Sequence, residues 1–196
     1  MSRWLAAIVA GLLVGVSSAA LAHPHVFVDY SVEYRVKDGA IVGLQLMWRF
    51  DDQYSSIVID SADADHDEKL SPAEIAHLAK RVVPSLEKAH LYTDVTLDGA
   101  KWLPRTVRDF SARIDDDRIV YSFAVDLPHP AHQVTVSTYD AEYYIEMLAI
   151  RKHAYSVVGA PAEALHCSLG FGPKVMTEFY GSFQPDAVTC AMAGGK

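Results

Sequence analysis

The sequence predicts a mainly β (α+β) protein, an antiparallel β-sandwich with an EF-hand-like helix–loop–helix inserted at about residues 51–89. Two observations lead to this fold class. Apolar and polar residues alternate in two strand-rich blocks that contain Asp-Gly turns, and a segment with helical spacing separates the blocks. With 196 residues, 51% of them apolar, the chain is long enough for one domain with its own core.

The first strand-rich block reads as a hairpin. Apolar residues recur at every second position from Val26 to Val36, which is the period of a half-buried strand. Asp38-Gly39 is a type I′ turn signal. The return strand is expected to carry its apolar face on Val42, Leu44, Leu46, Trp48 and Phe50.

The second strand-rich block runs from about residue 91 to residue 150. Another Asp-Gly pair, Asp98-Gly99, marks a turn, and apolar residues alternate clearly from Ile119 to Leu127. Residues 134–138 and 143–150 read as further strands. Several short strands with turn signals between them are typical of an antiparallel sandwich.

The segment between the blocks predicts two helices. Residues 51–61 can form the first, although three consecutive β-branched residues weaken that prediction. The second begins with Ser71 as N-cap, Pro72 at the first helical position and Glu74 completing a capping box. Pro84 is expected to kink or end this helix.

The loop between these helices matches the twelve-residue EF-hand pattern for Ca²⁺. Oxygen ligands fall at its usual positions, and Glu68 stands where the pattern has Gly for a left-handed turn. The strain of a non-Gly residue there is expected to weaken binding. The alternative is a solvated acidic loop that only caps a helix. The candidate calcium ligands are Asp63, Asp65, Asp67, the Lys69 carbonyl, Ser71 and Glu74.

Residues 1–22 read as a signal peptide, with a charged start, a short apolar run and an Ala-Leu-Ala end. The expected mature chain, residues 23–196, is a single periplasmic domain without a membrane span. Cys167 and Cys190 would then form a disulfide in an oxidising compartment, the alternative being two thiolate metal ligands beside His166.

Cleavage would leave His23 first, and its α-amine and ring could chelate a transition metal such as Zn, Ni or Co. His25, His129 and His132 are the further candidate ligands, while His90, His153 and His166 stay open. The alternatives are that His23 and His25 only precede the first strand without binding metal, and that His129 and His132 lie in a solvated loop. The net charge of −8 and the lack of a basic cluster argue against nucleic acid, and the absence of a nucleophile motif argues against an enzyme.

His-Pro-His-Val-Phe after a leader ending in Ala, the acidic loop ending Lys-Leu-Ser-Pro-Ala-Glu, and Tyr-Asp-Ala-Glu-Tyr-Tyr at residues 139–144 resemble domain-of-unknown-function family 1007. The resemblance covers roughly residues 23–170. It implies a periplasmic component paired with an inner-membrane permease for nickel, cobalt or zinc. The first hypothesis is therefore a metal-binding accessory protein of a transition-metal transporter. The alternative is a structural or interaction module of a transporter, with Ca²⁺ as a staple in its loop.

Overall fold

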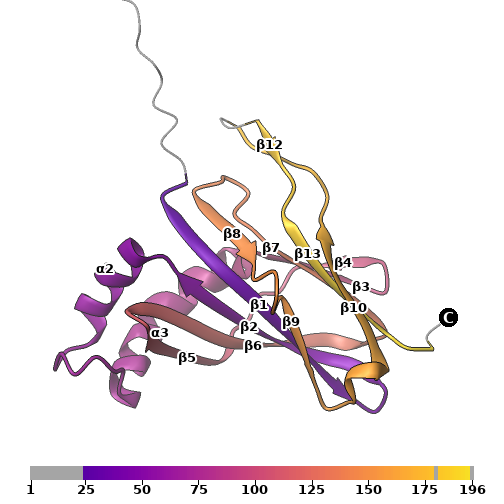
Figure 1. Ribbon diagram of the computed structural model, residues 1–196, viewed down its shortest axis with the longest axis horizontal. Helices are drawn as coiled ribbons and strands as arrows, with labels where there is room; N and C mark the ends of the chain where they lie inside the picture. Colours follow the sequence, from indigo (N-terminus) through magenta and orange to yellow (C-terminus); the bar gives the residue numbers. More distant parts are fainter. Residues whose placement is uncertain (1–23, 179–180, 195–196) are drawn as a thin grey trace, which may run out of the picture.

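The computed structural model describes residues 24–178 and 181–194, so residues 1–22 and His23 lie outside the described part. It is mainly β, with two sheets, a small hairpin and two helices (Figure 1). The strands are β1 Val26–Lys37, β2 Ala40–Phe50, β3 Thr93–Leu97, β4 Ala100–Trp102, β5 Arg108–Asp115, β6 Arg118–Ala131, β7 Gln133–Thr138, β8 Ile145–Ala149, β9 Tyr155–Val158, β10 Leu165–Phe171, β11 Val175–Met176, β12 Ser182–Phe183 and β13 Asp186–Met192.

The larger sheet has the order β5-β6-β2-β1-β8, with β9 also paired to β1. The predicted β1–β2 hairpin is confirmed: Lys37 pairs with Ala40, and Asp38 and Gly39 both have positive φ. The predicted antiparallel pairing is confirmed for β5, β6, β2 and β1, whereas β8 and β9 run parallel to β1. Both strands return to β1 after the chain has passed through the second sheet, and such a long connection permits parallel pairing.

The second sheet has the order β10-β13-β7-β3-β4. Its strands are antiparallel, and Asp98-Gly99 turns β3 into β4 with positive φ at both residues, as the sequence predicts. Cys167 in β10 lies directly opposite Cys190 in β13, and the two form a disulfide. The predicted disulfide is confirmed, and the alternative of two thiolate ligands is excluded.

Buried tyrosines connect the two sheets. Tyr30 and Tyr34 on β1 are fully buried, and their hydroxyls donate to the carbonyls of Asp186 and Val188 on β13, at 3.1 and 2.7 Å. Asp186 is itself buried, accepts the Ala149 N–H of β8 and pairs with the exposed Arg151. These bonds hold the inner face of the larger sheet against the second sheet, and the apolar core lies between them.

Two helices follow the first hairpin, α2 Asp52–Ala62 and α3 Pro72–Lys88. The predicted capping box of Ser71 and Glu74 is present. The helix continues past Pro84 to Lys88, so the expectation that Pro84 ends it is wrong. Pro84 lies on the exposed side, where water can reach the carbonyl that it leaves unpaired. Within the described residues no helix is long and apolar enough to cross a membrane.

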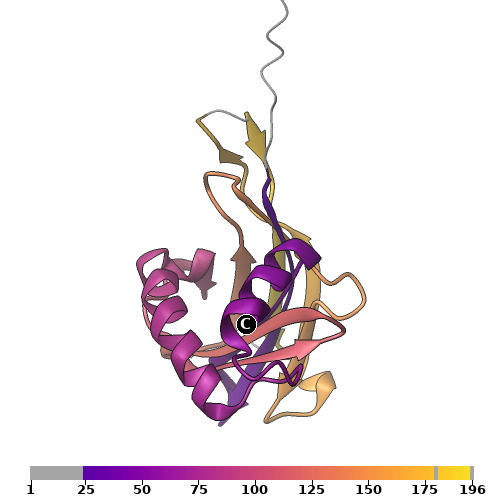
Figure 2. The ribbon, with the colours of Figure 1, turned by 90° about the vertical axis from the view of Figure 1, so that its left-hand side faces the viewer.

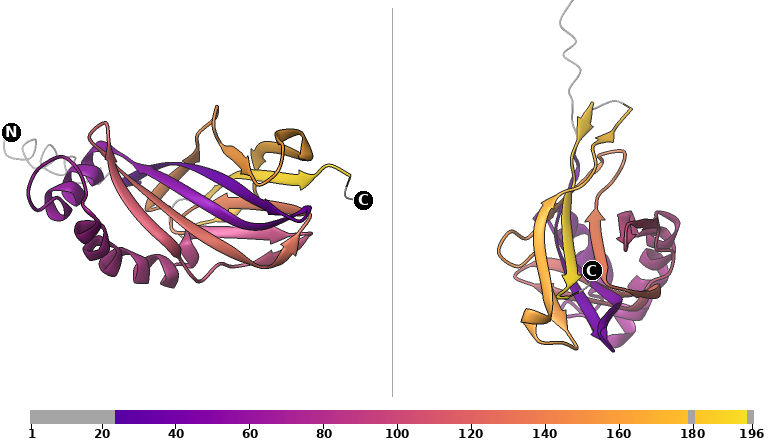
Figure 3. Two further views of the ribbon diagram at one scale, coloured as in Figure 1. Left: turned by 90° about the horizontal axis from the view of Figure 1, so that it is seen from below. Right: turned by 90° about the vertical axis from the view of Figure 1, so that its right-hand side faces the viewer.

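The helices lie at one end of the larger sheet, away from β10 and β13 (Figures 1 and 3). There they cover the aromatic part of its inner face, where Phe50 stacks on Tyr54 of α2 at 4.5 Å. At the beginning of β1 the β11–β12 hairpin projects from the body (Figure 2). The fold therefore places the helix–loop–helix and the start of β1 outside the region between the two sheets.

Candidate metal centre

Three carboxylates meet in the loop between α2 and α3. One oxygen each of Asp63, Asp65 and Asp67 lies within 4.8 Å of the other two. Asp63 is only 3% exposed, whereas Asp65 and Asp67 face solvent. Across residues 24–178 and 181–194, this is the only group of three or more His, Cys, Asp or Glu side chains close enough to share a metal ion. Oxygen-only ligands favour a hard cation such as Ca²⁺.

Asp63 organises the backbone of the loop. It follows the last residue of α2, and its carboxylate accepts the Asp67 N–H at 3.2 Å and the Glu68 N–H at 3.0 Å. The Asp67 carboxylate in turn accepts the Lys69 N–H at 2.9 Å. These hydrogen bonds turn the backbone of the loop back on itself. As a result Asp63, Asp65 and Asp67, which alternate with other residues in the sequence, converge on one point.

Glu74 joins the two ends of the loop. One carboxylate oxygen accepts the Ala64 N–H at 2.7 Å, and the other accepts the N–H and hydroxyl of Ser71 at 2.8 Å. These bonds, the Ser71 N–H first, lower the pKa of Glu74. The carboxylate is therefore charged at neutral pH, and the cap is lost as the pH falls through that lowered pKa. To bind an ion with both oxygens, Glu74 must exchange these hydrogen bonds for the metal.

Glu68 adopts the left-handed conformation, with φ 63°, at the position where the calcium pattern has Gly. The sequence prediction of strain at this residue is confirmed. Left-handed φ costs a non-Gly residue about 1–2 kcal/mol. Because Glu68 has this conformation in the folded protein, the strain lowers the stability of the folded state as well as the affinity for an ion.

Glu68→Gly is expected to raise the free energy of unfolding by about 0.5–1 kcal/mol without added metal, since relief of strain is partly offset by the greater chain entropy of Gly. Urea denaturation measures the change. Glu68→Ala is the matched control, because it removes the same carboxylate and keeps the strain. Equal stability of the Gly and Ala variants would contradict the left-handed assignment.

The histidines predicted as transition-metal ligands are not brought together. His25 precedes β1, where its N–H donates to the Tyr144 carbonyl at 2.9 Å and its ring lies 4.7 Å from the Tyr144 ring. His129 and His132 lie at the other end of the sheet, because Ala131 pairs with Ile41 next to the hairpin turn. The intervening strand has 12 residues, which at about 3.3 Å per residue corresponds to roughly 40 Å. The prediction that His25 shares a metal site with His129 and His132 is therefore wrong. His23 lies outside the described residues.

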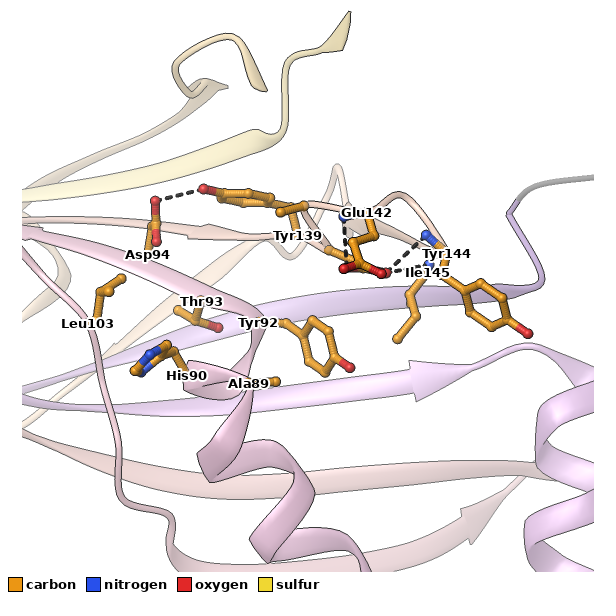
Figure 4. Close-up of a pocket in the computed structure, with 12 residues that line it drawn as sticks. Ala89, His90, Tyr92, Thr93, Asp94, Leu103, Tyr139, Glu142, Tyr144 and Ile145 are labelled. Atoms are coloured by element: carbon orange, nitrogen blue, oxygen red, sulfur yellow. Dashed lines mark hydrogen bonds between the residues drawn. The ribbon is translucent and has the colours of Figure 1, made fainter. Parts of the chain in front are cut away.

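A pocket of about 530 Å³ lies beside Tyr144 (Figure 4). Its carboxylates are largely engaged within the protein. Asp94 accepts the Tyr139 hydroxyl at 2.7 Å and pairs with Lys101, and the Asp140 carboxylate accepts the backbone N–H groups of three residues that follow it, Glu142, Tyr144 and Ile145. Burial and then the Asp94 bond raise the pKa of Tyr139, so this phenol remains protonated.

One wall of this pocket has an unusual backbone. His90, Leu91 and Tyr92 all have positive φ, between 47° and 56°. Leu91 is fully buried, and the Thr93 hydroxyl donates to its carbonyl at 2.7 Å, so packing and hydrogen bonding hold the strained turn. His90 lies at the opposite end of the pocket from Tyr144 (Figure 4), so it does not join His25 in a site. No sequence signal indicated this turn, since none of the three residues is Gly or Asn.

Taken together, the fold and the loop define a β-rich protein with an acidic helix–loop–helix between its first and second strand blocks. The chain belongs to the family described as a protein of unknown function, DUF1007, whose model matches residues 8–175. It is also similar to an uncharacterized protein of Haemophilus influenzae, with 28% identity over 152 residues, which cover 73% of this chain and 71% of the relative.

Proposed function

We propose that this protein is an extracytoplasmic accessory protein of a membrane transport system, and that its helix–loop–helix binds one Ca²⁺ as a structural ion. The observation that carries the Ca²⁺ site is the convergence of Asp63, Asp65 and Asp67 within 4.8 Å. The buried Asp63 anchors the loop, and Ca²⁺ would add bonds between the ends of α2 and α3. The disulfide favours an oxidising compartment such as the periplasm.

Calorimetric titration with Ca²⁺ tests the loop. The parent protein is expected to bind one ion with a dissociation constant of about 10⁻⁴–10⁻³ M, the range of extracellular calcium-binding modules. Asp65→Asn/Asp67→Asn should abolish the binding heat. Asp60→Asn is the control, since Asp60 is an exposed carboxylate of α2 outside the triad. Unchanged affinity in the double variant would remove the loop from the site.

The transport role rests on the sequence resemblance to periplasmic components that are paired with metal permeases. In this role the sheets would form the contact with an inner-membrane permease. The bound structural Ca²⁺ would hold the helix pair in a fixed position on the larger sheet. Crosslinking in cells between this protein and a metal permease is the expected outcome.

A second candidate function is delivery of Zn²⁺, Ni²⁺ or Co²⁺ to the same transporter through the exported N-terminus. The observation that favours it is the position of His25, which packs on Tyr144 beside the pocket where Glu142 is exposed. In a chain that begins at His23, the α-amine and the first imidazole would be only two residues from His25 in the sequence. Imidazole and amine nitrogens suit these metals, whereas the oxygen-only loop does not.

The mature protein that begins at His23 is expected to bind one transition-metal ion, and one extra residue before His23 should weaken binding at least tenfold. The extension converts the α-amine, with a pKa near 8, into an amide that does not coordinate. Binding should also fall below about pH 6, where imidazole is protonated. Zn²⁺ titration measures both effects. His129→Ala/His132→Ala is the control that should bind normally, and equal affinity of the extended form would contradict an N-terminal site.

A further inference from the structure

The helix pair and the larger sheet form a partly open cavity of about 330 Å³. Its lining is mostly apolar and aromatic, and the residues come from both helices, from β1, β2, β6 and β8, and from the strained turn before β3. Its volume lies at the lower end of the range of small-molecule pockets. Residues that define its walls include Trp48, Phe50, Tyr54, Val82, Leu86 and Tyr121.

One hydrogen-bond donor in this lining lacks a protein partner. The indole Nε1 of Trp48, a side chain only 2% exposed, is buried without a hydrogen bond within the described residues. The neighbouring Tyr121 hydroxyl interacts with Tyr54. An indole N–H can only donate, so an acceptor must come from another molecule if it is to be satisfied. Unsatisfied donors are rare in protein interiors because they cost free energy.

The charge at the cavity has one sign. Among the described residues, Arg81 of α3 is the only charged one in the lining, although the protein as a whole has a net charge of −8. It forms no ion pair in the part of the chain that the structure describes. Burial and then the neighbouring Tyr54 raise the pKa of Tyr121. The Arg81 guanidinium opposes the rise in pKa of both Tyr121 and Tyr54, so its charge acts on both hydroxyls. Tyr121 is therefore a protonated donor at neutral pH.

We propose that this cavity binds a small amphipathic carboxylate, with its apolar chain among the aromatic and aliphatic side chains and its carboxylate toward Arg81. The carboxylate oxygens would accept from the Arg81 guanidinium and from the Trp48 N–H, the donor without a protein acceptor. A cationic ligand is disfavoured, because the described residues of the lining include no carboxylate to pair with it. Neither the acidic loop nor the N-terminal histidines take part in this site.

Decanoate is the probe, and decanol is the same chain without the charge. In a Trp4→Phe/Trp102→Phe background Trp48 is the single tryptophan. Its fluorescence should change on addition of either ligand, with tighter binding of decanoate. Arg81→Gln should weaken decanoate binding about tenfold or more and leave decanol binding unchanged, because a charge-assisted bond is lost. Arg81 is exposed, so this variant should fold as the parent does. Arg105→Gln, an exposed residue outside the cavity, is the matched control.

Trp48→Phe, followed by calorimetry, tests the donor itself. It keeps an aromatic ring and removes the N–H, so both ligands should bind more weakly. Absence of decanoate binding at millimolar concentration would overturn the proposal. Equal decanoate affinity of the parent and Arg81→Gln would also overturn it, because the chain would then bind without recognition of the carboxylate.

Discussion

Saturating Ca²⁺ is expected to stabilise the protein by about 2.7 kcal/mol when its free concentration is 100 times the dissociation constant. The reason is that the folded loop gathers three carboxylates within 4.8 Å, whereas the unfolded chain does not. Binding to the folded state alone shifts the unfolding equilibrium by mass action. Repulsion among the three charges without the ion is already contained in the dissociation constant. Chelator-treated protein should therefore unfold at a lower temperature.

Urea denaturation in Ca²⁺ and in chelator measures this stabilisation. Asp63→Asn should abolish the difference between the two conditions, because Asp63 is the buried member of the triad and anchors the loop through two backbone bonds. Asp60→Asn should retain it. A Ca²⁺ effect of equal size in the parent and in Asp63→Asn would mean that the ion acts elsewhere.

Cys167→Ala/Cys190→Ala is expected to lower the free energy of unfolding by about 3 kcal/mol in the chain-entropy model. The disulfide closes a loop with a sequence separation of 23 residues and joins β10 to β13. Without it, the unfolded chain gains conformational freedom, and β10 is held at the sheet edge by its hydrogen bonds to β13 and by the bond from the Tyr155 hydroxyl to the Cys167 carbonyl. Denaturation under non-reducing conditions gives the difference.

The parent protein after reduction is the control for the disulfide. Its stability should fall to that of the double variant, apart from the small cavity that Ala leaves at the fully buried Cys190. A loss of less than about 1 kcal/mol in both would show that the reduced unfolded chain retains structure in this region.

Features with local signals could be predicted from the sequence. The β1–β2 hairpin follows from strict alternation and from Asp38-Gly39, and the start of α3 follows from the Ser71 and Glu74 side chains that cap it. The aspartate spacing predicted that the loop would gather its carboxylates, and the EF-hand pattern, which has Gly at this position, predicted the left-handed φ of Glu68. Each of these depends on residues that are close together in the chain.

Features that depend on distant parts of the chain could not be predicted. The parallel pairing of β8 and β9 with β1 is set by where a long connection returns, and no residue type encodes it. The separation of His25 from His129 and His132 follows from the strand order. The left-handed turn at 90–92 and the cavity beside Trp48 arise from packing between elements that are remote in sequence.

The central claim, one divalent ion in the acidic loop, is tested most directly by an NMR titration of the ¹⁵N-labelled protein with Ca²⁺. The expected result is that the largest amide shifts fall on residues 63–74 and saturate at one equivalent of bound ion, whereas the amides of His25 and His132 stay in place. Shifts that are centred on the start of β1, with residues 63–74 unchanged, would contradict the assignment of the loop as the ion site.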